Sequence, residues 1–235
     1  MERPNAMSHL RDYLKQIIFG GNDGIVTTFA IVAGFAGANA DGVSQVGALA
    51  VLIFGLANLF ADAVSMGLGE FLSSRSAHDL YRARRLRRVK AITHFPEAEI
   101  VSLSETFQHK GLSPDKARAV SEALTSSPQL MAEMLLCHKH GVQPPEDDNP
   151  GINGIVTFVS FVIFGFLPLV PYVLREADDL SLSLSVAATL TALTGLGILR
   201  WTATGDKPSA AILETVGVGS ACAAVAYLVG WLVGG

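Results

Sequence analysis

Long apolar stretches recur five times along the chain, and each is long enough to cross a lipid bilayer as a helix. A spanning helix needs about 20 consecutive, predominantly apolar residues. Residues 17–38 form the first stretch and contain a single charged residue, Asp23. The pattern therefore predicts five transmembrane helices. The other four stretches contain no charged residue and cover residues 42–61, 151–174, 180–199 and 215–235.

Proline positions indicate how two of these helices end. Residues 67–88 contain no proline, so we expect the second helix to continue beyond the membrane as one long helix. The third stretch contains Pro168 and Pro171. Because proline removes a backbone donor and clashes with the preceding turn, the third helix should kink there or end early.

Charged residues gather in one segment between the second and third apolar stretches. Residues 75–149 hold 21 of the 38 Lys, Arg, Asp and Glu residues. Pro96, Pro114 and Pro128 each precede a helix-compatible segment, and proline is favoured in the first turn of a helix. This insert should form two or three short helices. Their expected ranges are residues 97–109, 114–125 and 128–140.

The fold prediction is an all-α polytopic membrane protein with five transmembrane helices and a small cytoplasmic helical insert between helices 2 and 3. The organisation is residues 1–74 with helices 1 and 2, residues 75–149 as the insert, and residues 150–235 with helices 3–5. Seven basic residues lie between positions 75 and 90. Since basic loops stay on the cytoplasmic side, we expect the N terminus and the insert there.

Other classes receive little support from the composition. The start of the chain lacks the features of a cleaved secretory signal, and nothing indicates nucleic-acid binding. Cys137 and Cys222 fall in the insert and in the last apolar stretch, so we expect two free thiols and no disulfide. A haem, flavin or nucleophile signature is missing, so we expect neither an enzyme nor a prosthetic group.

Four polar or sulfur-containing side chains recur at every fourth position along one apolar segment, which begins in the second stretch and continues past its end. Asn58, Asp62, Met66 and Glu70 would form one stripe on a helix. Carboxylates are costly in lipid, so this stripe should face the bundle interior or a wet cavity. We interpret it as a metal path. The alternative is polar contact between helices, with Met66 as core filler.

Asp23 lies in the first apolar segment within Gly20-Gly21-Asn22-Asp23-Gly24. The glycines permit close helix contact or local unwinding. On one reading Asp23 faces the same polar path. On the other, this sequence is the cytoplasmic end of the helix, and Asn22 or Asp23 caps it.

The residue types of the stripe indicate which ions it would accept. Oxygen ligands suit hard cations and a thioether adds softness, so the set favours a transition metal such as Fe²⁺, Mn²⁺ or Co²⁺ over Mg²⁺. Carboxylates also bind protons. A simple exchange follows, in which arriving metal displaces protons from Asp23, Asp62 or Glu70, and protonation on the other side releases the metal.

The chain resembles the vacuolar iron transporter family. Two sequences carry the resemblance, FGGNDGIVTT at residues 19–28 and ADAVSMGLGEFLS at residues 61–73, together with the five-span layout and the proline-rich third span. The family's first-span aspartate matches Asp23, and its second-span methionine matches Met66. In many members an acidic residue stands at the position of Asn58 and a glycine at that of Asp62, so this chain departs from the family there.

The resemblance implies a homodimer in the lipid bilayer that moves Fe²⁺ or Mn²⁺ out of the cytosol in exchange for protons. The first two helices would form the path. The membrane would be the plasma (inner) membrane in a bacterium and a vacuolar-type membrane in a eukaryote. The insert matches the family's metal-binding domain in position, with a weaker acceptor site expected at Glu97, Glu99, Glu105, Met131 and Met134.

Two alternatives remain at this stage. The insert departs from the family's dense glutamate pattern, so Cys137, His138 or His140 could replace missing carboxylates, or the insert could serve folding or dimerisation alone. The protein as a whole could be a membrane-anchored metal sensor or buffer without transport.

Overall fold

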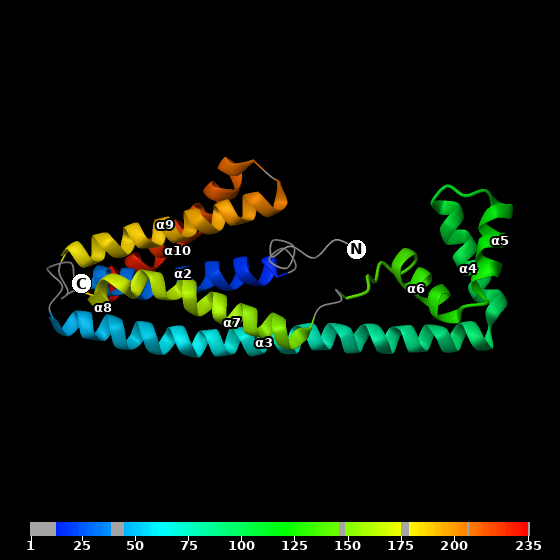
Figure 1. Cartoon of the computed structure of the whole chain (residues 1–235), viewed down its shortest axis with the longest axis horizontal. Coiled ribbons are helices and arrows are strands. Elements are labelled where there is room, and N and C mark those ends of the chain that lie inside the picture. The colour runs from blue at the N-terminus through cyan, green and yellow to red at the C-terminus, as the bar shows by residue number, and fades with distance from the viewer. Residues whose placement is uncertain (1–12, 39–44, 146–148, 175–178, 206, 235) are drawn as a thin grey trace, which may run out of the picture. The chain divides into compact units, whose positions relative to one another are not determined.

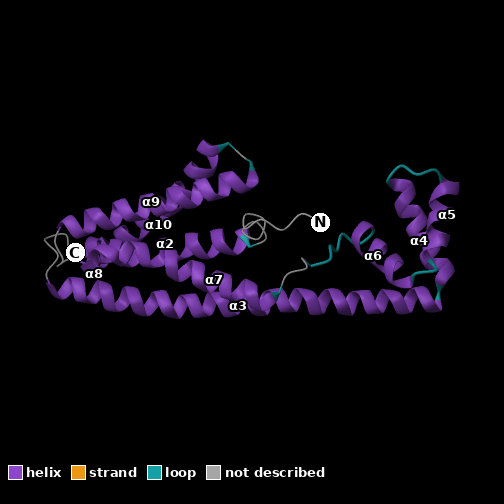
Figure 2. Cartoon of the chain, in the orientation of Figure 1, coloured by secondary structure: helices purple, strands orange, loops and turns teal. Residues whose placement is uncertain are grey.

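A computed structural model describes residues 13–38, 45–145, 149–174, 179–205 and 207–234. Within these ranges the regular structure is helical and no strand occurs (Figure 2). The chain divides into two compact units. We call residues 1–71 with 150–235 the membrane unit, and residues 72–149 the insert unit.

The membrane unit contains the five helices that are long and apolar enough to cross a membrane. This finding confirms the prediction of five spans. α2 (Leu14–Ala38) begins the described chain, and α3 (Gln45–His94) follows it. The third span comprises α7 (Pro150–Phe166) and α8 (Val170–Leu174), and the fourth and fifth are α9 (Asp179–Thr204) and α10 (Pro208–Gly234), as labelled in Figure 1.

Two features of these helices follow the proline pattern. α3 is a single helix of 50 residues, as the proline-free stretch after Met66 predicted, and its C-terminal part belongs to the insert unit. α7 ends at Phe166 and passes through a 3₁₀ turn, η1 (Leu167–Leu169), into α8. Pro168 lies in that turn, so the third span ends its regular α-helix early, as expected.

Glycines allow α2 and α7 to pack with their backbones in contact. A Cβ atom placed on Gly20 would lie 2.6 Å from the carbonyl oxygen of Thr157, and one on Gly24 would clash with the carbonyl of Phe161. Gly20 meets Thr157 and Gly24 meets Phe161, so the residue numbers rise in the same direction along both helices. α2 and α7 therefore run parallel. Small residues bring membrane helices together in this way.

The interior of the membrane unit is formed where α2, α3 and α7 meet. Phe29 and Val32 from α2 pack with Leu59 from α3 and with Phe161 from α7. α9 covers another side of α2, where Leu193 contributes to a second buried cluster. α2 therefore contacts α3, α7 and α9 and lies at the centre of the unit.

The insert unit contains three short helices packed on the C-terminal part of α3. They are α4 (Pro96–His109), α5 (Pro114–Leu124) and α6 (Pro128–His138). Each begins at the proline expected to start it, and each ends within two residues of the expected end. Ile92 of α3, Leu103 of α4 and Leu135 of α6 are among the residues of its buried core.

Candidate metal path

The polar stripe of α3 is turned toward the protein. Asn58, Asp62, Met66 and Glu70 are each partly buried. Of the apolar side chains between them, Leu59 and Ala63 are fully buried, whereas Phe60, Val64 and Leu68 point outward and are 51%, 49% and 57% exposed. This is the arrangement that a membrane environment favours, because polar groups avoid lipid and apolar ones tolerate it.

The carboxylates of Asp62 on α3 and Asp23 on α2 interact electrostatically across the two helices. Neutral groups hold both in place. The amide of Asn58 donates a hydrogen bond to Asp62 Oδ2 (2.6 Å), and the hydroxyl of Thr27 donates to Asp23 Oδ1 (3.5 Å). The repulsion between two like charges is relieved by a proton or a cation. The arrangement is therefore suited to binding either one.

The position of Asp23 rules out the capping interpretation. α2 begins at Leu14 and continues without interruption through Asp23 to Ala38. Asp23 thus lies more than two turns inside the helix, where the backbone amides that a cap would satisfy are already bonded. The surrounding glycines do not unwind the helix, because Gly20 and Gly24 serve the contact with α7 described above.

Glu70 is hydrogen-bonded to a residue that the sequence analysis did not identify as part of the path. The amide of Gln16 on α2 donates to Glu70 Oε1 (3.3 Å), and Gln16 is only 3% exposed. Its amide oxygen is buried and has no hydrogen-bond partner among the described residues. Gln16 precedes Asp23 by seven residues, which is two helical turns on one face. That spacing was the signal that could have identified it.

Asn22 also carries a buried amide oxygen with no hydrogen-bond partner among the described residues. A buried acceptor without a donor costs about 1–3 kcal/mol in an apolar environment. A cation near such an oxygen would remove that cost. Met66 is different, since its partly buried side chain packs against the apolar core formed by α2, α3 and α7.

The membrane unit of one chain does not gather a full set of charged ligands. In the part of the chain that the structure describes, no group of three or more His, Cys, Asp or Glu side chains lies close enough to hold one metal ion. The structure brings together Asp23 with Asp62, Asp62 with Asn58, and Glu70 with Gln16.

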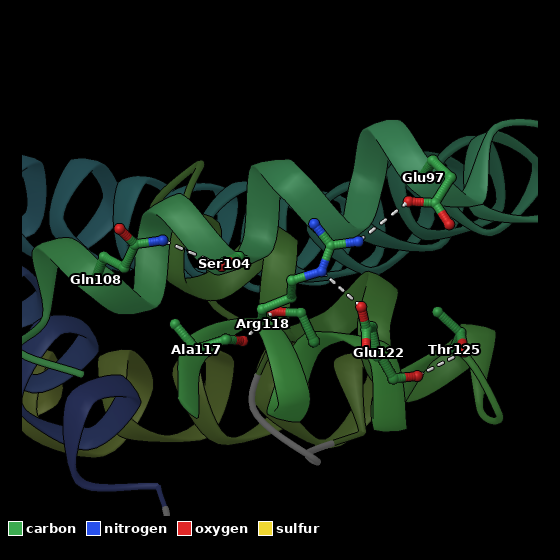
Figure 3. Close-up of polar contacts among 8 residues, drawn as sticks. Glu97, Ser104, Gln108, Ala117, Arg118, Glu122 and Thr125 are labelled. Atoms are coloured by element: carbon green, nitrogen blue, oxygen red, sulfur yellow. Dashed lines mark hydrogen bonds and ion pairs between the residues drawn. The ribbon is translucent and has the colours of Figure 1, made fainter. Parts of the chain in front are cut away.

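The glutamates of the insert unit are bound to arginines. Figure 3 shows Arg118 of α5 between Glu97 of α4 (3.9 Å) and Glu122 (2.7 Å). Glu99 accepts two hydrogen bonds from Arg88 of α3, at 2.9 and 3.2 Å, and is 12% exposed. Two of the three glutamates that the sequence marked as acceptors, Glu97 and Glu99, thus have a cationic partner.

The other expected insert ligands lie apart from these pairs. Glu105 is exposed on α4. Met131 is fully buried in the apolar core of the insert unit, and Met134 packs against that core. Cys137 donates from its thiol to the side chain of Gln143 (3.4 Å). The structure of the single chain therefore does not bring the five expected residues into one site.

Carboxylates buried on adjacent apolar helices are typical of membrane proteins that move ions. Residues 14–231 match the family model of the VIT family. The chain is 32% identical to Vacuolar iron transporter 1 of Arabidopsis thaliana, over 92% of this chain and 84% of that protein. It is 30% identical to Vacuolar iron transporter 2 of Oryza sativa subsp. japonica, over 92% and 85%.

The chain is also similar to a vacuolar iron transporter from an organism that is not a plant. The chain is 33% identical to the Vacuolar iron transporter of Plasmodium falciparum (isolate 3D7), over 94% of this chain and 82% of that protein. The protein is thus a multi-pass membrane protein of a transporter class. It belongs to the VIT family.

Proposed function

We propose that the protein transports Fe²⁺, and also Mn²⁺, out of the cytosol in exchange for protons. The observation that supports this most is the electrostatic repulsion between Asp23 and Asp62, two carboxylates on separate membrane helices. A pair of this kind binds a divalent ion when both groups are ionised and holds protons when they are not. The names of the relatives favour iron as the substrate.

The proposed path runs along the facing sides of α2 and α3. Asp23, Asn58, Asp62, Met66 and Glu70 would supply its ligands. Glu70 would stand at the cytosolic end, because it is the member of the stripe nearest in sequence to the basic residues 75–90. Gln16, held against Glu70, would add its amide oxygen there. Met66 would add a soft ligand that discriminates against Mg²⁺.

We further propose that the working unit is a homodimer. An open groove of about 470 Å³ adjoins α2 and α3, with Asn58 at its edge beside apolar residues such as Phe35 and Phe54. A second copy could close this groove and complete a ligand set that one chain leaves incomplete among its described residues. The N terminus and the insert unit would lie on the cytosolic side.

For the insert unit we propose a weaker cytosolic acceptor site. Glu97, Glu99 and Glu105 of α4 would bind metal, with Met131 and Met134 of α6 as soft ligands. Glu105 is exposed and is the one among these glutamates without an ion pair in the described part of the chain. Glu97 and Glu99 would have to exchange an arginine for the metal, which makes this site the weaker of the two.

Uptake into proteoliposomes tests the transport proposal. The purified protein is reconstituted, a proton gradient is imposed, and the entry of Fe²⁺, Mn²⁺, Co²⁺ and Zn²⁺ is measured. Gradient-dependent uptake should be lost in Asp23→Ala and reduced in Met66→Ala. Glu214→Gln is a matched control, since Glu214 also lies on a membrane helix but pairs with Arg200 at 2.8 Å.

The same experiment separates transport from sensing. A sensor or buffer would bind metal and yet carry none of it across the bilayer, with or without a gradient. If a folded wild-type protein retains bound metal but shows no uptake of any of the four ions, the transport proposal is wrong. Uptake that does not depend on the gradient would support transport and would contradict the exchange for protons.

A further inference from the structure

The arginines that follow the membrane part of α3 have separate roles in the structure. Arg85 pairs with Glu133 of α6 at 2.7 Å, and Arg88 pairs with Glu99 of α4. These two hold helices of the insert unit together. Arg84 has no ion pair in the described part of the chain, and Arg87 makes one hydrogen bond, from Nε to the carbonyl of Ala83 (3.4 Å).

Arg84 and Arg87 line a pocket of about 620 Å³ together with Arg88. All three lie on one face of α3, because their spacing of three and four residues is that of successive helical turns. The opposite wall includes Leu136 of α6 and His140, which follows that helix. The pocket is therefore basic on one side, and apolar residues complete its lining.

His140 is held in the pocket wall by the turn that ends α6. Gly141 has a positive φ of 64°, and beyond it the amide of Val142 donates to the carbonyl of Leu136 (2.9 Å). This fold of the backbone brings His140 Nε2 to 2.5 Å from Arg88. Since arginine can only donate, Nε2 accepts this bond and the imidazole is neutral. Burial, with Arg88 and Lys139 nearby, lowers the pKa of His140, which agrees with a neutral ring.

The pocket thus presents three guanidinium groups, of which one is balanced by Glu99. Guanidinium groups bind phosphate oxygens through paired, charge-assisted hydrogen bonds. We propose that this pocket binds the phosphate group of an organic phosphate. Such a group is carried by an anionic lipid headgroup or by a soluble phosphorylated molecule, and the chemistry of recognition is the same for both.

Two probes distinguish these sources, and both use the full-length protein. Inositol trisphosphate is titrated into the protein in neutral detergent and the heat of binding is measured. Separately, the protein is assembled in phosphatidylcholine nanodiscs with and without phosphatidate, and retained phosphatidate is counted by native mass spectrometry. Binding in the first experiment identifies a soluble ligand, and binding in the second alone identifies a lipid.

Paired variants test whether the pocket is the site. Arg84→Ala/Arg87→Ala should weaken binding by at least about tenfold, because two charge-assisted contacts are removed. Arg75→Ala/Arg82→Ala removes the same charge from exposed positions of α3 outside the pocket and should leave affinity unchanged. Arg84→Gln alone disturbs no ion pair of the insert unit and serves if the double variant does not fold.

The outcomes are decisive in both directions. Selective loss of binding in Arg84→Ala/Arg87→Ala, or in Arg84→Gln, supports the pocket. Wild-type protein that binds neither probe overturns the proposal. So does an equal loss in the two double variants, because the attraction would then be a general effect of the basic helix.

Discussion

The aspartates of the candidate path in the membrane unit and the ion-paired glutamates of the insert unit have different kinds of partner. In the membrane unit, Asp23 accepts from the hydroxyl of Thr27 and Asp62 accepts from the amide of Asn58. In the insert unit, four glutamates are paired with arginines. The pairs are Glu97 and Glu122 with Arg118, Glu99 with Arg88, and Glu133 with Arg85.

The difference shows which acidic groups are ready to bind a cation. A neutral donor orients a carboxylate and leaves its charge uncompensated, whereas an arginine already supplies the opposite charge. A metal ion can therefore approach Asp23 and Asp62 without displacing a cation from the described part of the chain. At Glu97 and Glu99 it must compete with a guanidinium group.

Of the variants that test this comparison, Asp23→Asn should have the largest effect on metal uptake. The amide keeps the shape of the side chain and removes the charge, so we expect initial metal uptake to fall by roughly 100-fold or more. Proteoliposome uptake measures it. Glu97→Gln, which removes an arginine-bound charge from the insert, should retain most of the activity, and equal losses in the two variants would contradict the comparison.

Gly24→Ala tests whether backbone contact fixes the position of Asp23. The added Cβ would clash with the carbonyl of Phe161, so we expect a loss of stability of about 1–3 kcal/mol and slower transport. Thermal unfolding in detergent measures the first effect. Gly69→Ala is the control, since its Cβ would meet nothing within 4 Å. A stable, fully active Gly24→Ala would show that the close contact is unnecessary.

Arg88→Met should destabilise the insert unit and leave the membrane unit unaffected. It removes the partner of Glu99, which is only 12% exposed, and an unpaired charge in such a position costs about 1–2 kcal/mol. Arg88→Met/Glu99→Leu should recover most of this loss, because no charge is then left alone. Chemical denaturation of the four proteins of this double-mutant cycle gives the coupling energy.

Arg118→Ala should have the smallest effect on stability. Its side chain is 58% exposed, and exposed ion pairs contribute little. The variant frees Glu97 from its cationic partner, so metal binding to the insert should strengthen if Glu97 is an acceptor. Calorimetric titration of the full-length protein with Mn²⁺ measures this. Weaker binding in the variant would argue against the competition between arginine and metal.

Much of the fold was accessible from the sequence because lipid imposes a strong pattern. The five spans, the uninterrupted α3 and the early end of α7 all follow from apolar length and proline position. The start of α2 was harder to predict. Lys15 and Gln16 precede the apolar run and look like a flanking segment, yet the helix begins at Leu14. The capping interpretation of Asp23 arose from that difference.

The candidate site could be predicted only in part from the sequence. Periodicity places Asn58, Asp62, Met66 and Glu70 on one face, since that property depends on a single helix. The partners of these residues depend on how helices pack. Sequence spacing could not show that Gln16 donates to Glu70, or that Arg88 holds Glu99. These contacts join residues 54 and 11 positions apart.

The contact between α2 and α10 has a consequence for the order of assembly in the cell. Gly230 of α10 lies directly against the backbone of Gly34, and Gly37 lies against that of Tyr227. α2 leaves the ribosome first among these helices and α10 last. One side of the central helix therefore remains uncovered within its own chain until α10 has been synthesised. A chain that stops before α10 would leave α2 without this neighbour.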